Sequence, residues 1–166
     1  MLGQEISSTT RIVLASVMAA LVCIATMLIR IPIPATEGFF NIGDGMIMVA
    51  ALACGPIVGA FAGGIGSALA DLFGMYYVWV IPTLIIKGIE GFLAGWILRS
   101  GKKNVQNVFF AWIVGGLEMV FGYFLVQIYF YGFSAALVEL PFNFVQMAVG
   151  GVVGIPVSQA VKRILT

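Results

Sequence analysis

The chain has 166 residues, of which 61% are hydrophobic and only 9% are charged, and its formal net charge is +1. Soluble globular domains carry about 25% charged residues, so this composition predicts an integral membrane protein. The small net charge provides no basic stripe for nucleic acid. The sequence contains no histidine, which removes the usual metal ligand and general base, and its two cysteines, Cys23 and Cys54, lie inside apolar runs.

Apolar runs that approach the length of a membrane helix, about 20 residues, fill most of the chain. The first run ends before prolines at 32 and 34, so 30–44 is predicted to be a loop. A Gly-Pro step at 55–56 divides the next apolar block into a short helix and a glycine-rich helix. In the latter, Gly59 and Gly63 form a small-xxx-small pair that favours close helix packing.

The C-terminal part of the chain continues this pattern. Pro141 suits the first turn of a helix, so the last span is predicted to begin there and 131–140 to form a loop. The apolar runs lack the alternation typical of barrel strands, which indicates an all-α membrane protein. We predict a single membrane domain over 1–166, a six-transmembrane-helix bundle with helices at about 10–30, 45–54, 56–73, 80–98, 108–130 and 141–161.

The distribution of charge predicts the orientation. With six spans, both termini share one side, which carries Arg11, Arg99, Lys102, Lys103, Lys162 and Arg163. The opposite side carries Arg30 and the acids Glu37, Asp44, Asp71 and Glu139. Basic residues favour the cytoplasm. Both termini are therefore predicted to be cytoplasmic, with the acidic loops outside.

Three charged residues fall inside predicted spans, where ionisable groups are costly and usually face the protein interior. Lys87 and Glu90 stand at i and i+3 on one helix, where their side chains can meet. They form either a self-neutralising structural pair or a polar wall of a ligand pocket. For Glu118, a structural or coupling role is favoured over ligand contact.

Polar and aromatic groups are concentrated in the outer halves of the last two spans. Amides at similar depth, with aromatic rings near them, suit a pocket for a planar ligand that forms hydrogen bonds. An interfacial aromatic belt with amide bonds between helices is the alternative. The candidate pocket residues are Tyr123, Gln127, Tyr131, Asn143 and Gln146. Without GxSxG, P-loop or clustered acidic motifs, the sequence does not indicate an enzyme.

The stretch IPIPATEGFFNIGDGMIMVAALACGPIVGAFAGGIGSALADL, at 31–72, resembles the central region of the substrate-binding S components of energy-coupling factor (ECF) vitamin transporters. The shared pattern is a proline-containing loop, a short helix, a Gly-Pro turn and a glycine-rich helix ending near Ala-Asp-Leu. The segment from Ala15 to Ala19 resembles the AxxxA motif by which S components contact the shared coupling subunit.

This resemblance implies a function. S components of the prokaryotic cell membrane bind a vitamin from outside, then join a transmembrane coupling subunit and two cytoplasmic ATPases that drive its uptake. The family's pocket is formed by the loop after the first helix and the last three helices, which adds Phe39, Phe40 and Asn41 to the candidates and gives Lys87 and Glu90 a place beside them. Phe39 and Phe40 either cover the pocket as a lid or anchor the loop in the lipid interface.

The resemblance is strongest to the riboflavin branch, so riboflavin is expected as the transported ligand, with no cofactor. Pyridoxine, hydroxymethylpyrimidine, thiamine and queuosine precursors stay open as alternatives. A stand-alone channel or facilitator, and a small membrane enzyme or assembly scaffold, are the competing functions. A channel is less favoured because it needs a polar stripe across the whole bilayer.

Overall fold

A computed structural model describes residues 7–102 and 104–165, so Lys103, which was assigned to the basic side, lies outside the described part. The long helices are α1 (Ser8–Leu28), α3 (Pro56–Phe73), α4 (Val80–Ser100), α5 (Val105–Tyr131) and α6 (Phe133–Leu165). These five helices are long and apolar enough to cross a membrane. Their outward faces carry exposed apolar side chains such as Ile12 and Val152, 67% and 75% exposed, as expected for contact with lipid. The chain is a membrane protein.

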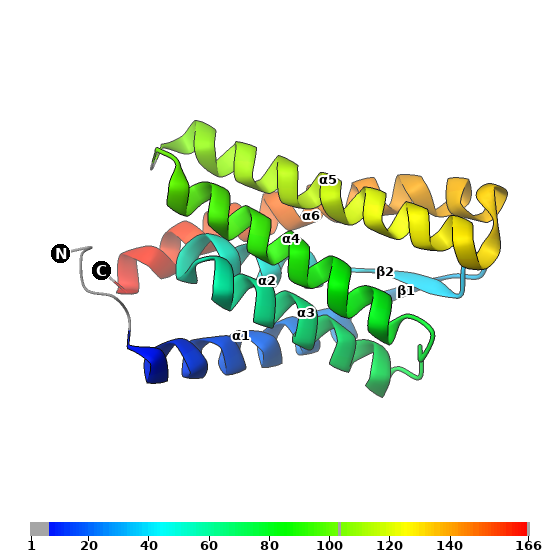
Figure 1. Ribbon diagram of the computed structural model, residues 1–166, viewed down its shortest axis with the longest axis horizontal. Helices are drawn as coiled ribbons and strands as arrows, with labels where there is room; N and C mark the ends of the chain where they lie inside the picture. The colour runs from blue at the N-terminus through cyan, green and yellow to red at the C-terminus, as the bar shows by residue number, and fades with distance from the viewer. Residues whose placement is uncertain (1–6, 103, 166) are drawn as a thin grey trace.

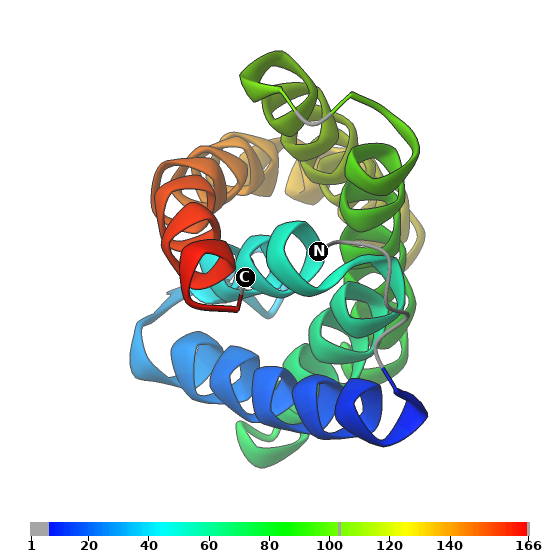
Figure 2. The same ribbon diagram turned by 90° about the vertical axis from the view of Figure 1, so that its left-hand side faces the viewer.

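The second span expected from the sequence is shorter than the five long helices and lies at the centre of the bundle. It consists of the seven residues of α2 (Gly43–Val49) and the five of the π-helical turn η1 (Ala50–Cys54). At about 1.5 Å per residue, this helix extends at most roughly 18 Å and does not cross a 30 Å hydrocarbon layer by itself. Figure 2 shows α2 surrounded by the other helices, and most of its residues are buried.

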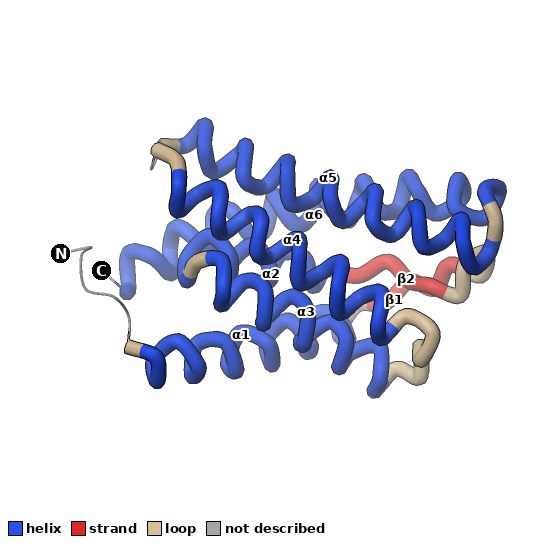
Figure 3. The backbone as a smooth tube through the Cα atoms, in the orientation of Figure 1, coloured by secondary structure: helices blue, strands red, loops and turns tan. Residues whose placement is uncertain are grey.

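The predicted loop at 30–44 forms an antiparallel β-hairpin of β1 (Arg30–Ile33) and β2 (Gly38–Asn41), followed directly by α2. Pro32 pairs with Phe39, and the pairing satisfies backbone groups that a free loop would leave without partners. The hairpin and α2 lie within the length of α5 and α6 (Figures 1 and 3). Such backbone is tolerated at membrane depth only where protein surrounds it.

The prediction for the start of the last helix was wrong. Residues 133–140 belong to α6, and Pro141 lies inside that helix. The break between α5 and α6 falls at Gly132 instead, whose φ of 85° reverses the chain in one residue. The expected turn at Gly55 before Pro56 is present, with a φ of 95° at Gly55.

Close helix contacts depend on glycine, as predicted for Gly59 and Gly63. A Cβ atom on Gly59 would lie 2.5 Å from the carbonyl oxygen of Gly91, and one on Gly63 would lie 2.3 Å from that of Lys87. The backbones of α3 and α4 therefore touch where any larger residue would separate them. The same holds for α6 against α2, because a Cβ atom on Gly154 would lie 2.7 Å from the carbonyl oxygen of Gly45.

The two ends of the bundle differ. The start of α1, the end of α6 and the adjoining ends of α4 and α5 lie at one end of the bundle, and the hairpin lies toward the other (Figure 1). This arrangement agrees with the predicted grouping of basic segments, while the assignment of that end to the cytoplasm stays a prediction.

Candidate ligand-binding site

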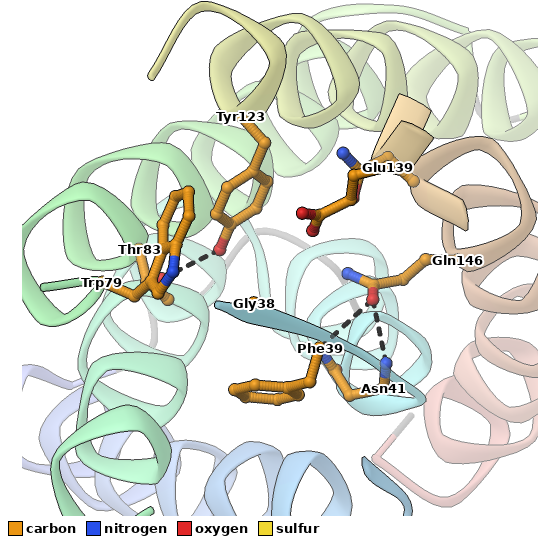
Figure 4. A pocket seen from close by; sticks show the side chains of 9 residues that line it. Gly38, Phe39, Asn41, Trp79, Thr83, Tyr123, Glu139 and Gln146 are labelled. Atoms are coloured by element: carbon orange, nitrogen blue, oxygen red, sulfur yellow. Dashed lines mark hydrogen bonds between the residues drawn. The ribbon is translucent and has the colours of Figure 1, made fainter. Parts of the chain in front are cut away.

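A small polar cavity lies between the hairpin and the helices α4, α5 and α6, with a volume of about 30 Å³. Figure 4 shows Phe39 of β2 on one side, Trp79 and Thr83 on another, and Tyr123 and Glu139 opposite the hairpin. The lining residues are Gly38, Phe39, Asn41, Trp79, Thr83, Tyr123, Glu139, Asn143 and Gln146. They come from one strand, three helices and the residue before α4, so the cavity forms only in the folded chain.

Aromatic rings form one wall of the cavity. Trp79 lies directly before α4, with its ring centroid 5.8 Å from that of Tyr123 and 6.0 Å from that of Tyr131, to which it is nearly parallel at 21°. The Tyr123 hydroxyl forms a 3.0 Å hydrogen bond with Thr83. Flat rings with fixed polar tips suit the face and the edge of a planar ligand.

One face of α6 supplies the opposite, polar wall. Glu139, Asn143 and Gln146 stand at i, i+4 and i+7, a spacing that places them on the same side of the helix. All three are buried, at 5%, 5% and 3% exposure. Within 7–102 and 104–165, the Nδ2 atom of Asn143 has no hydrogen-bond partner. A buried donor in this state is ready to bind an acceptor.

The hairpin is fixed to this wall at both ends. At the end of β2, the backbone N–H and Nδ2 of Asn41 donate to Oε1 of Gln146 at 3.0 and 3.2 Å. At the turn, the Thr36 hydroxyl donates to Oε2 of Glu139, and the Trp79 indole N–H donates to the Thr36 carbonyl at 3.3 Å. The hairpin therefore closes the cavity through side chains that also line it.

A buried ion cluster lies beneath the cavity. The Lys87 ammonium contacts Asp44 at 2.5 Å and Glu90 at 3.1 Å, so the predicted pair exists and has a third member. Gln146 connects this cluster to the cavity, because its Nε2 donates to both Asp44 oxygens at 3.3 Å. The prediction that Asp44 lies in a loop was wrong: it stands in the first turn of α2 and is 1% exposed, where it contacts Lys87.

Two further acids assigned to outer loops are also buried. Asp71 is 3% exposed in the last turn of α3, and Glu139 lies on α6 because that helix begins earlier than expected. The role assigned to Glu118, structural or coupling, stays a prediction. Its Oε2 is buried without a partner among the described residues.

Half of the predicted ligand residues line the cavity: Phe39, Asn41, Tyr123, Asn143 and Gln146. The others lie around it. Phe40 alternates to the opposite face of β2, Lys87 and Glu90 form the ion cluster, and Tyr131 stacks behind Trp79. Gln127 is fully buried, and neither atom of its amide has a partner among the described residues. Which of these groups contact a ligand stays a prediction.

Sequence reasoning missed four lining residues: Gly38, Trp79, Thr83 and Glu139. Trp79 and Thr83 stand at i and i+4 at the start of α4, a repeat that gives a weak signal for a shared face. Glu139 was assigned to a loop, and nothing local distinguishes Gly38 from other hairpin residues.

A second, apolar groove of about 450 Å³ runs along α1 and α3. Ala15 and Ala19, the residues expected to contact a partner, both line it. Ala19 is 8% exposed and also packs inward, since a Cβ atom on Gly66 would lie 2.5 Å from the Ala19 carbonyl oxygen. The groove is further lined by Arg11, Ile12, Ser16, Ala20, Ile57, Phe61, Ile65 and Leu69.

A membrane bundle with a small polar cavity and an apolar groove on its side suits a membrane protein that binds a small ligand. The family model for the S component of ECF-type riboflavin transporters matches residues 6–163. The chain belongs to this family of S components, as the resemblance predicted. Membership implies a vitamin ligand and partners from an ECF module.

One of two similar proteins supports this assignment. The chain is 30% identical over 154 residues to the thiamine precursor transporter HmpT of Lactococcus lactis, covering 92% of this chain and 88% of that protein. It is 46% identical over 132 residues to a Pyrococcus woesei protein described as an uncharacterized protein in gap 3′ region, covering 80% of this chain and 87% of the relative.

Proposed function

We propose that this protein captures riboflavin at the outer face of the cell membrane and delivers it to an ECF module for ATP-driven uptake. The observation that carries the proposal is the cavity, in which three aromatic rings face a wall of amide and carboxylate groups. Rings of this kind stack on an isoalloxazine, and the polar groups match its hydrogen-bonding edge.

Riboflavin entry requires the hairpin to move. A cavity of about 30 Å³ has room for only one or two water molecules, far less than a three-ring flavin. The hairpin carries Phe39 and is held to α3, α6 and Trp79 by a few side-chain hydrogen bonds, so its opening would require only these bonds to break. We therefore favour the lid alternative for this segment over the interfacial anchor.

A smaller ligand, hydroxymethylpyrimidine, is the second candidate. Two observations favour it: the relative in Lactococcus lactis is named as a thiamine precursor transporter, and the cavity contains a carboxylate that an aminopyrimidine would satisfy. The test is native mass spectrometry and an absorption spectrum of protein purified from its own membranes, followed by calorimetric titration with each compound. Bound flavin supports the first candidate, and bound pyrimidine supports the second. Protein that binds neither contradicts both.

We further propose that the groove along α1 and α3 receives the transmembrane coupling subunit. Small residues such as Ala15 allow a partner helix to approach closely. Ala15→Trp fills the groove and is expected to abolish uptake while ligand affinity stays unchanged. The matched control is Val17→Trp, on the same helix, 53% exposed and outside the groove. Equal loss of binding and uptake in Ala15→Trp contradicts a role in partner contact.

A further inference from the structure

The cavity contains one charged group whose hydrogen bonds are incomplete. Among the described lining residues, Glu139 carries the only formal charge, and its carboxylate points into the cavity (Figure 4). Oε2 accepts from Thr36, but Oε1 accepts no hydrogen bond from the part of the chain that the structure describes. A Cβ atom on Gly38 would lie 3.0 Å from Oε1, so the carboxylate lies directly against the backbone of β2.

A free donor stands one helical turn from this free acceptor. Nδ2 of Asn143 is buried without a partner among the described residues, and Asn143 follows Glu139 by four positions on the same face of α6. Gln146, the next residue on this face, has its amide occupied by Asn41 and Asp44. Glu139 and Asn143 are therefore the α6 side chains left to bind a ligand.

We propose that Glu139 and Asn143 together select a ligand edge on which an N–H donor stands beside an acceptor, and that Glu139 joins this edge to the lid through Thr36. Glu139 Oε1 accepts from the ligand N–H, while Asn143 Nδ2 donates to the adjacent ligand nitrogen or oxygen. The same carboxylate holds the hairpin through Oε2, so ligand recognition and closure share one side chain. This inference rests on the proposed function and names the ligand chemistry of that site.

The required edge is common to both candidate ligands. Riboflavin has a ring N–H between two carbonyl groups, and an aminopyrimidine has an amino group beside a ring nitrogen. The Glu139 carboxylate has no cation partner among the described residues and therefore repels anions, so phosphorylated or carboxylated forms of either ligand are expected to be excluded. The specificity expected is for the free vitamin.

Blocking the ligand donor tests the selection. Calorimetry on purified protein compares riboflavin with N3-methylriboflavin, and hydroxymethylpyrimidine with its analogue lacking the amino group. The unaltered protein is expected to prefer the intact ligand by about 10- to 100-fold, as for a hydrogen bond to a charged group. Glu139→Gln is expected to lose most of this preference. Asn143→Ala is expected to weaken the binding of the intact ligand by about tenfold or more.

The lid connection has its own test. Thr36→Val removes the hydroxyl that donates a hydrogen bond to Glu139. This variant is expected to raise the ligand off-rate while the preference for the intact ligand stays unchanged. Thr36→Ser, which keeps the hydroxyl, is the matched control. If Glu139→Gln discriminates between the ligand pairs as well as the unaltered protein, the selection is refuted. If Thr36→Val releases ligand at the rate of Thr36→Ser, the connection to the lid is refuted. Unaltered protein that binds neither intact ligand contradicts the proposed function instead.

Discussion

Replacing Lys87 by methionine is expected to destabilise the protein strongly. Lys87 is 2% exposed and is the cation between Asp44 and Glu90, which are each 1% exposed. Methionine fills similar space but leaves two buried carboxylates facing each other without a cation. Breaking a buried ion pair by removing one partner costs about 3–5 kcal/mol. In a chain of this length, about 2–4 °C of melting temperature is lost per kcal/mol, so a fall of roughly 6–20 °C is expected.

The measurement is the loss of helical circular dichroism on heating in detergent. Lys102→Met is the matched control, because Lys102 is exposed at the turn between α4 and α5. Adding Asp44→Asn and Glu90→Gln to Lys87→Met removes the uncompensated charge and is expected to restore most of the stability. If Lys87→Met melts with the unaltered protein, the cluster does not stabilise the fold. If the triple variant is as unstable as the single one, lost packing rather than charge is the cause.

Three further predictions follow from particular contacts. Gly91→Ala places a Cβ atom 2.2 Å from a carbonyl oxygen of α3 and should lower the free energy of unfolding by about 1–3 kcal/mol, measured by thermal melting. Gly88→Ala, whose Cβ atom would lie 3.6 Å from the nearest atom, should be tolerated, and equal melting temperatures of the two variants would contradict the close approach. Phe39→Ala should raise the ligand off-rate several-fold in stopped-flow experiments, while Phe40→Ala, on the other face of β2, should not; the reverse order refutes the assignment. Lys102→Cys, in a background without the native cysteines, should not be labelled by an impermeant thiol reagent added outside intact cells. Labelling from outside would contradict the predicted cytoplasmic position of this segment.

Local chemistry was sufficient to predict much of the fold. Gly55 and Pro56 mark a turn by backbone preferences alone, and the spacing of Gly59 and Gly63 predicted close helix packing, which the structure shows against α4. The i, i+3 spacing of Lys87 and Glu90 predicted their ion pair. Each of these features depends on residues close together in the chain.

The features that were missed depend on distant residues. The hairpin at 30–44 was read as a loop because its strands are stable only beneath the surrounding helices. Asp44 was assigned to a loop because its partner Lys87 is 43 positions away. Glu139 was excluded from the site because Pro141 resembles a helix start, although neighbouring helices allow α6 to continue through it. The lining of the cavity is set by these tertiary contacts.

The central position of α2 has a consequence for how the protein is made. This segment precedes most of the helices in the chain, yet α6, the last of the described helices in chain order, packs closely on it through Gly154. Asp44 at its start meets Lys87 only after α4 exists, and Gln146 only after α6 exists. Until then, a short helix with a carboxylate at its beginning has no stable place in lipid. Residues 30–54 therefore have their full set of native contacts only when α4 and α6 are both in place, so the packing of α6 completes both the fold and the cavity.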